Sequence, residues 1–172
     1  MDYEDFLRFG KGEDGNTSFL KGDISPFLED GDLFKQITRE MAAPFLHSRI
    51  DKVASIEARG FLFAGAIAYI LDAGIVMVRK EGKLPMDVLR RELVDYSDKK
   101  KTLEIHRDGV RKGERVLVID DWFETGAQAR AATQMIEQLG GIIIGFSVLI
   151  DNTTKEARKF FSNHNYHYLV QI

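Results

Sequence analysis

The sequence predicts a doubly wound α/β protein, in which helices flank a mainly parallel sheet. Short, unbroken apolar runs alternate along the chain with segments whose apolar residues recur every three or four positions. Such runs are typical of parallel strands buried on both faces, and the periodic segments between them are typical of crossover helices. Gly74 and Gly140 come where two of these helices should end. We therefore expect the 172 residues to form one domain, 1–172.

The first half of the chain predicts an amphipathic helix and then a βαβ unit. The helix is expected from Asp30 to about Arg49, with a kink or break at Pro44. Next come a buried strand at 53–56 and a turn at 57–60. A helix that is apolar nearly all round follows at 61–71, and a second strand at 75–78. The crossover of this unit should be right-handed.

The second half predicts another such unit and a short C-terminal helix. Residues 81–101 are polar and lack clear periodicity, so no element is predicted there. A strand at 115–119 is followed by a helix at about 125–139 and a long strand at 142–150. A short helix, capped by Thr153 or Thr154, should then extend to 161, and 166–170 should form an edge strand.

Composition excludes several classes of protein. The formal net charge of −3 and the pI of about 5.8 give no electrostatic reason to expect nucleic acid or an anionic membrane as partner. Cysteine is absent, which excludes disulfides, thiolate metal sites and Cys nucleophiles. The first residues are acidic rather than basic, and no apolar run approaches the roughly 18 residues of a membrane helix. We expect a cytoplasmic protein.

One segment combines two carboxylates with a helix start. Asp120 and Asp121 follow the strand 115–119, where open α/β sheets bind their ligands. Thr125, Gly126, Ala127 and Gln128 then open a helix whose N–H groups and positive dipole end suit a phosphate. The pair of carboxylates and the phosphate cradle match a ribose 5-phosphate, with hydroxyls at one end and phosphate at the other. The alternative is that both carboxylates only cap the following helix or bind nothing.

The segment 118–126 resembles the phosphoribosyl pyrophosphate (PRPP) motif of the type I phosphoribosyltransferases. Three other segments resemble the adenine phosphoribosyltransferases in the same order and spacing: Lys21-Gly22-Asp23-Ile24-Ser25-Pro26, Glu57-Ala58-Arg59-Gly60-Phe61 and Val78-Arg79-Lys80-Glu81-Gly82-Lys83-Leu84-Pro85. The resemblance covers nearly the whole chain. It implies an enzyme that forms a homodimer and transfers phosphoribose from PRPP to a purine base, with adenine as the first candidate.

The resemblance also implies roles for individual residues. Asp120 and Asp121 would bind the ribose hydroxyls, directly or with the help of Mg²⁺, and 125–128 would hold the 5′-phosphate. The basic residues Arg59, Arg79, Lys80 and Lys83 would hold the departing pyrophosphate. Hood segments are expected near 1–30 and 81–106. Within the second of these, 102–106 resembles a hood strand, which makes Glu104 structural rather than catalytic.

The chain departs from this family pattern at three places. Glu124 replaces a small residue and Ala127-Gln128 replace Gly-Thr; Glu124 either points to solvent or serves as an acid or base at the purine. The hood acid aligns with Ser97-Asp98 or, after a two-residue insertion, with Asp95-Tyr96. The stacking Phe of the base pocket is absent or replaced by Phe19, beside Leu20 and Lys21. Two alternatives stay open: another purine (xanthine, guanine or hypoxanthine), or a catalytically weak nucleotide-binding regulator.

Overall fold

A computed structural model of the chain describes residues 3, 8–10, 21–94 and 100–172. In this part of the chain, seven strands form one sheet in the order β5-β6-β4-β3-β7-β8-β9. Strands β4, β3, β7, β8 and β9 run parallel, whereas β5 and β6 pair antiparallel with their neighbours. Their bounds are β3 Lys52–Ile56, β4 Gly74–Lys80, β5 Val88–Val94, β6 Lys100–His106, β7 Arg115–Phe123, β8 Ile142–Asp151 and β9 Asn165–Gln171. A doubly wound, mainly parallel sheet was predicted and is confirmed.

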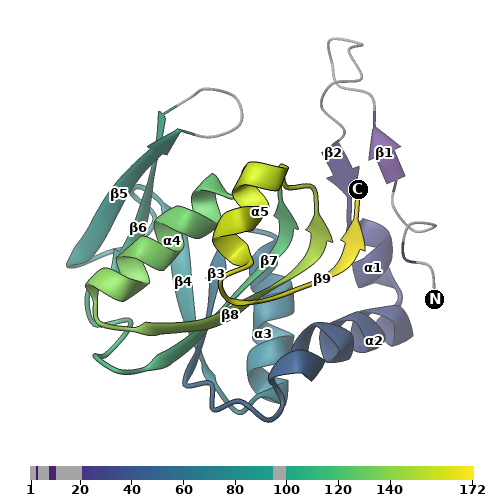
Figure 1. Cartoon of the computed structure of the whole chain (residues 1–172), viewed down its shortest axis with the longest axis horizontal. Helices are drawn as coiled ribbons and strands as arrows, with labels where there is room; N and C mark the ends of the chain where they lie inside the picture. Colours follow the sequence, from purple (N-terminus) through teal and green to yellow (C-terminus); the bar gives the residue numbers. More distant parts are fainter. Residues whose placement is uncertain (1–2, 4–7, 11–20, 95–99) are drawn as a thin grey trace.

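Helices cover both faces of the sheet (Figure 1). One buried cluster joins α2 and α3 to side chains such as Val53, Leu117 and Leu149. The other joins α4 and α5 to the alternate side chains of the same strands, such as Ala54 and Val118. The helices are α1 Ser25–Glu29, α2 Gly31–Ala42, α3 Gly60–Ile70, α4 Ala127–Gln138 and α5 Lys155–Phe161, with a 3₁₀ turn at Ala43–Phe45.

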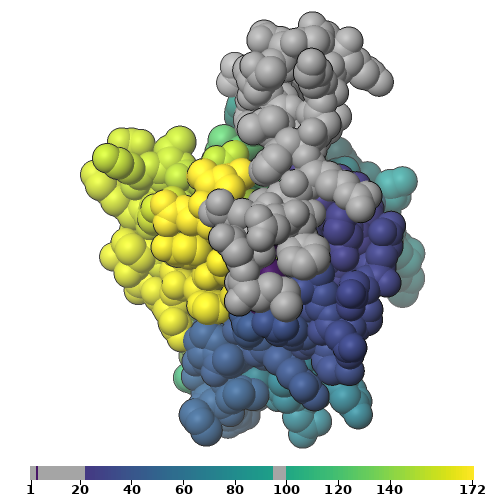
Figure 2. Space-filling model, turned by 90° about the vertical axis from the view of Figure 1, so that its right-hand side faces the viewer, coloured from purple at the N-terminus to yellow at the C-terminus, as the bar shows by residue number. Residues whose placement is uncertain are grey.

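The N-terminal part of the described chain lies beside the C-terminal strand. A separate two-stranded sheet joins β1 (Arg8–Gly10) to β2 (Lys21–Asp23). Helix α2 packs against β9, and Figure 2 shows the yellow C-terminal residues next to the dark blue helices. Among the described residues, no helix is both long and apolar enough to cross a bilayer.

The structure corrects three local predictions. The helix expected from Asp30 begins at Gly31, capped by the Asp30 carboxylate, and ends before the 3₁₀ turn that contains Pro44. Residues 88–94, for which no element was predicted, form β5, because pairing with β6 supplies its backbone hydrogen bonds. Strand β7 does not stop at Ile119 but continues to Phe123, because β8 pairs with it as far as Asp151.

Candidate active site

The candidate residues gather where the parallel strands end. Parallel strands present their carboxyl ends at one edge, which is where open α/β sheets bind ligands. Glu57 follows β3, Lys80 ends β4, and Asp120 and Asp121 lie near the end of β7. The arrowheads of β7, β8 and β9 in Figure 1 point to this edge, and the β5–β6 hairpin and the β1–β2 sheet rise on either side of it. The sequence predicted that the two aspartates lie in a turn after the strand. This prediction is wrong, because both belong to β7 itself.

The Asp120-Asp121 pair is held in a largely buried setting. Asp121 is 6% exposed, and its Oδ2 lies 2.7 Å from Nη2 of Arg59. Burial raises the pKa of Asp121, although the Arg59 charge acts in the opposite direction. Burial and the neighbouring Asp121 charge raise the pKa of Asp120 well above its ordinary value. Ionising this pair therefore costs free energy, and carboxyl groups perturbed in this way are common at catalytic sites.

Gly60, the first residue of α3, makes room for this pair. A Cβ built on Gly60 would meet Oδ1 of Asp120 and lie 2.5 Å from Oγ of Ser55. It would also lie 3.2 Å from the Asp120 Cα, which belongs to the backbone and cannot rotate away. The glycine of the segment 57–61 therefore serves close packing of α3 against β7, a role that the sequence pattern alone does not reveal.

Arg59 links the acidic pair to the N-terminal segment. Its Nη1 donates to the carbonyl oxygen of Gly22 at 3.0 Å, while its Nη2 faces Asp121. Half of the Arg59 side chain stays exposed. The structure thus brings together a residue predicted to bind pyrophosphate and one predicted to bind ribose.

The basic residues after β4 divide into two kinds. Nε of Arg79 lies 3.2 Å from Oε2 of Glu57, which also accepts from the backbone N–H of Lys80 at 3.1 Å. Burial acts to raise the pKa of Glu57, but these hydrogen bonds and charges outweigh it and hold the pKa below its ordinary value. No described residue forms an ion pair with the ammonium groups of Lys80 or Lys83. Arg79 therefore serves the loop's structure, while the two lysines remain available to an anion.

Glu104 of β6 holds the loop that carries Lys83. Its side chain is fully buried, and Oε1 accepts from the N–H groups of Lys83 at 2.7 Å and Leu84 at 2.6 Å. Its Oε2 lies 3.4 Å from Nε of Arg90. Burial acts to raise the pKa of Glu104, but these N–H donors and Arg90 outweigh it and lower the pKa below 4.5. The contacts agree with the structural role expected for Glu104.

Glu104→Gln is expected to destabilise the protein by about 1–3 kcal/mol at neutral pH, because hydrogen bonds to a charged, buried acceptor are lost. Because the pKa of Glu104 is lower in the folded protein than its ordinary value of 4.5, the ionised side chain stabilises the fold at pH values above 4.5. This stabilisation disappears as the pH falls through the folded-state pKa. Urea unfolding at several pH values should thus show the gap between wild type and variant closing in acid. Glu81→Gln is the control, because exposed Glu81 lies 3.6 Å from the same Arg90. Equal losses in both variants would contradict the expectation.

The predicted phosphate loop lies between β7 and α4. Gly126 caps α4 with φ of +70°, a conformation that favours glycine, and α4 begins at Ala127 rather than at Thr125. The first N–H groups of a helix have no partner within it, but Ala127 N–H donates to Oγ1 of Thr125 at 3.2 Å. Thr125 is exposed, and Gln128 is half-buried. An anion here would meet the N–H of Gln128 directly and compete with Thr125 for that of Ala127.

The predicted base-binding segment is described only in part. Phe19, Leu20 and the hood acid Asp95 lie outside the described residues, and the backbone of Lys21 belongs to β2. The next residue, Gly22, packs against the ring of Trp122, because a Cβ at Gly22 would overlap the indole. Sequence reasoning missed Trp122, although the chain's single tryptophan directly after two aspartates was a signal. Glu124 is half-buried.

The carboxylate pair fits a Mg²⁺ ion that arrives with a phosphate ligand. Among the described residues, no group of three or more His, Cys, Asp or Glu side chains could hold a metal ion alone. Mg²⁺ commonly takes only one or two carboxylates and completes its shell with water and substrate phosphates. Asp120 and Asp121 supply such a donor set, although Arg59 occupies Oδ2 of Asp121.

Comparison with known proteins gives consistent matches. The family model described as "Phosphoribosyl transferase domain" matches residues 28–167. The adenine phosphoribosyltransferase of Dinoroseobacter shibae is 42% identical over 138 residues, which are 80% of this chain and 76% of the relative. The solved adenine phosphoribosyltransferase of Rhodothermus marinus has a TM-score of 0.90 and 33% identity, covering 98% and 96% of the two chains. That of Giardia lamblia, complexed with 9-deazaadenine, has a TM-score of 0.90 and 25% identity, covering 99% and 96%.

Proposed function

Because this chain belongs to the phosphoribosyltransferase family, we propose that it transfers phosphoribose from PRPP to adenine and releases pyrophosphate. The family and the enzyme class predicted from the sequence are confirmed by the comparisons. The observation that carries the proposal is the largely buried Asp120-Asp121 pair, which lies five residues before the Gly126 cap of α4 at the carboxyl edge of the sheet. The residue roles below are proposals on that basis.

Asp120 and Asp121 are proposed to face the ribose of PRPP. As the bond from C1′ to pyrophosphate breaks and the bond from C1′ to the base nitrogen forms, positive charge builds on the sugar. Carboxylates already held in a low-dielectric setting stabilise that charge without reorganisation. Because Arg59 lies 2.7 Å from Asp121, the sugar hydroxyls must share or displace this ion pair.

The leaving group is proposed to meet the basic loops after β3 and β4. Arg59, Lys80 and Lys83 are assigned to the pyrophosphate, and Arg79 is assigned to both the loop and the anion, since it already binds Glu57. Thr125, Gly126, Ala127 and Gln128 are assigned to the 5′-phosphate. Bound Mg²⁺ would offset the negative charge of the diphosphate at Asp120 and Asp121. The proton of the base nitrogen must leave as the new bond forms, and Glu124 and Asp95 stay candidates to accept it.

Adenine is proposed as the base on the strength of the relatives, which carry that name, and of the neighbouring segments. Phe19, Leu20 and Lys21 are assigned to the base. Residue 22, next to them, contacts both Arg59 and Trp122, so this segment reaches the carboxylate pair. A purine at Lys21 would therefore lie within reach of the ribose.

Incubating the protein with PRPP, Mg²⁺ and one base at a time tests the proposal. We expect pyrophosphate release with adenine and little with guanine, hypoxanthine or xanthine. Release only with another purine would replace adenine as substrate, and tight PRPP binding without release under any base would leave the regulator alternative. Repeating the adenine assay with chelator in excess tests Mg²⁺, because a metal-dependent reaction stops and recovers when Mg²⁺ is added back.

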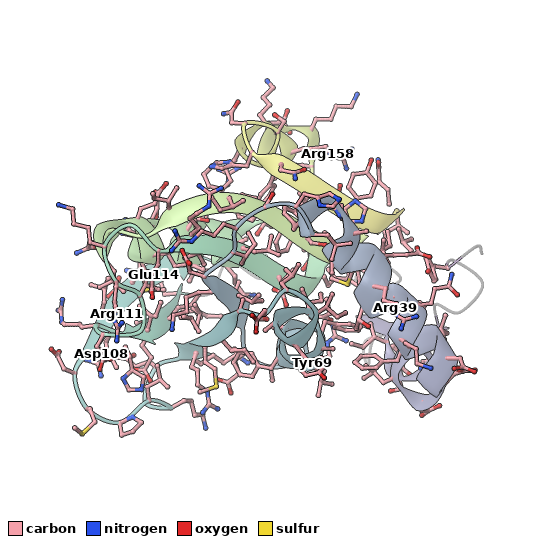
Figure 3. All side chains as sticks on the ribbon, turned by 90° about the horizontal axis from the view of Figure 1, so that it is seen from below. Arg39, Tyr69, Asp108, Arg111, Glu114 and Arg158 are labelled. Atoms are coloured by element: carbon pink, nitrogen blue, oxygen red, sulfur yellow. The ribbon has the colours of Figure 1, made fainter. Side chains whose placement is uncertain are left out.

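A homodimer is proposed through one apolar surface, formed by Leu62 and Tyr69 of α3 and by Ile75 and Met77 of β4. Leu62 is 53% exposed and Tyr69 90%, and Figure 3 shows Tyr69 on α3. Ile75 and Met77 alternate with Val76 and Val78, which are buried on the α4 side, so they face the α3 side. Exposed apolar residues gathered on one face typically mark an interface between proteins. A second copy of the chain would bury them.

Tyr69→Arg is expected to shift the protein to monomer in analytical ultracentrifugation, because a charge would be buried within the apolar surface. Ile142→Arg provides the matched control, since Ile142 is 48% exposed but lies at the start of β8, outside that surface. Unchanged sedimentation of the Tyr69 variant would contradict this interface.

The remaining sequence predictions are kept as proposals. We propose that 1–172 forms one domain, with hood segments near 1–30 and 81–106, of which β1–β2 and β5–β6 are described. The cytoplasmic location and the absence of a nucleic-acid or membrane partner stay predictions from the sequence.

A further inference from the structure

We propose that Phe161 of α5 is a positioning residue that shapes the loop 124–126 and thereby sets the affinity for PRPP. The inference rests on the proposed role of 125–128 in phosphate binding. Phe161 lies far from this loop in the sequence, and it belongs to none of the motifs on which the resemblance depends. Its ring nevertheless contacts both ends of the loop.

At the loop's end, the Phe161 ring occupies the space where a side chain of Gly126 would lie. A Cβ on Gly126 would come within 2.7 Å of Cε2 and 2.8 Å of Cζ of Phe161. Gly126 also has φ of +70°. The glycine therefore lets the loop lie directly against the ring, in addition to any approach to phosphate.

At the loop's start, the same ring stacks on Phe123, the last residue of β7. The two ring centroids are 5.0 Å apart with an interplanar angle of 23°. Only Glu124 and Thr125 lie between Phe123 and Gly126. One rigid side chain thus fixes both flanks of the short segment from which the first N–H groups of α4 project.

Phe161 is itself firmly held. Its side chain is fully buried, and its ring also stacks on Tyr166, with centroids 5.1 Å apart. Helix α5 is anchored by Arg158, labelled in Figure 3, whose Nη2 lies 3.0 Å from Oδ2 of the buried Asp151. Nη2 of Arg130 donates to the carbonyl oxygen of Ala157 at 3.3 Å, which ties α4 to α5. The ring therefore transmits the geometry of α5 to the phosphate loop.

A smaller side chain at 161 would leave a void behind the loop, so the loop could adopt other positions. Binding sites depend on supporting side chains that hold the contacting groups within about 0.5 Å. The loop holds the phosphate equally before and during the reaction. A misplaced loop should therefore weaken PRPP binding and leave the chemical step unchanged. A raised KM with unchanged kcat is the signature of such uniform binding.

Phe161→Leu tests this role against Phe160→Leu. Phe160 lies on the same helix and packs on Phe146, Arg130 and Phe161 itself. Phe160→Leu removes the same atoms while leaving the Phe161 ring against Phe123 and Gly126. We expect the Phe161 variant to raise KM for PRPP about tenfold with kcat within twofold of wild type, and Phe160→Leu to leave both nearly unchanged. Thermal unfolding should show a larger loss of Tm in Phe161→Leu, whose ring is fully buried, than in Phe160→Leu, whose ring is half-buried.

Equal KM values for PRPP in the two leucine variants would overturn the inference, as would a fall in kcat alone. Thr125→Ala separates this failure from failure of the proposed phosphate site. If Thr125→Ala raises KM for PRPP and Phe161→Leu does not, only the positioning role is wrong. If Thr125→Ala also has no effect, the assignment of 125–128 is wrong and the inference falls with it. Direct PRPP titration by calorimetry gives the same comparison in a variant with too little turnover to measure.

Discussion

Replacing Asp121 with Asn is expected to lower kcat/KM for PRPP by about 10²–10³-fold, the usual effect of removing one preorganised electrostatic contact, or about 3–4 kcal/mol. The amide keeps the size of the carboxylate but loses the negative charge that the proposed transition state requires. It also releases Arg59, whose Nη2 lies 2.7 Å from Asp121. Steady-state kinetics with adenine and PRPP give the measurement.

The same substitution is not expected to destabilise the fold. Because burial raises the pKa of Asp121, the folded state binds its proton more tightly than the unfolded chain does. Stability from this group is therefore present at low pH and is lost as pH rises through the folded-state pKa. Above that pKa the buried charge opposes folding, and a neutral Asn removes that cost. Arg59 stays half exposed and can be hydrated. Tm should match or exceed that of wild type.

Asp108→Asn is the control, since Asp108 is an exposed carboxylate in the loop between β6 and β7 (Figure 3). It should change neither kcat/KM nor Tm. A large loss of activity together with a large fall in Tm in Asp121→Asn would point to a structural role for this carboxylate. Activity within threefold of wild type would remove Asp121 from the proposed reaction.

The sequence predicted the elements that have a local residue pattern and missed those that depend on contacts between distant segments. The parallel strands were predicted because burial on both faces produces unbroken apolar runs, as in 142–150. Strand β5 was missed because its apolar residues are separated by Arg90, Arg91 and Glu92, and its pairing with β6 is a tertiary contact. The extension of β7 to Phe123 depends likewise on β8, to which the motif itself gives no clue.

The same division applies to the candidate site. Asp120-Asp121 and 125–128 were predicted because carboxylates and a helix start are adjacent in the sequence. The ion pair between Arg59 and Asp121 joins residues of different segments, so no spacing rule could reveal it. The ring of Phe161 behind Gly126 was hidden for the same reason. Sequence thus identifies the groups that would touch the ligand, whereas the side chains that hold them emerge only from packing.

Gly60→Ala is expected to have the second large effect, because this position supports the acidic pair directly. The added Cβ would meet Oδ1 of Asp120 and Oγ of Ser55. The Asp120 Cα lies 3.2 Å from the same Cβ, so rotation of side chains cannot relieve the whole overlap. Helix α3 or β7 must shift. Overpacking of this kind costs about 1–3 kcal/mol of stability.

The expected loss in kcat/KM is about 100-fold, because displacing a catalytic group by roughly 1 Å has effects of that size. Helix propensity alone predicts the opposite, since Ala stabilises a helix relative to Gly by about 1 kcal/mol. Gly31→Ala separates the two effects: Gly31 is likewise the first residue of its helix, α2, and a Cβ there would meet nothing within 4 Å. It should leave activity unchanged and Tm equal or higher. If both alanine variants behave alike, Gly60 reflects helix geometry alone, and the tight packing of α3 against Asp120 does not control the position of the carboxylate.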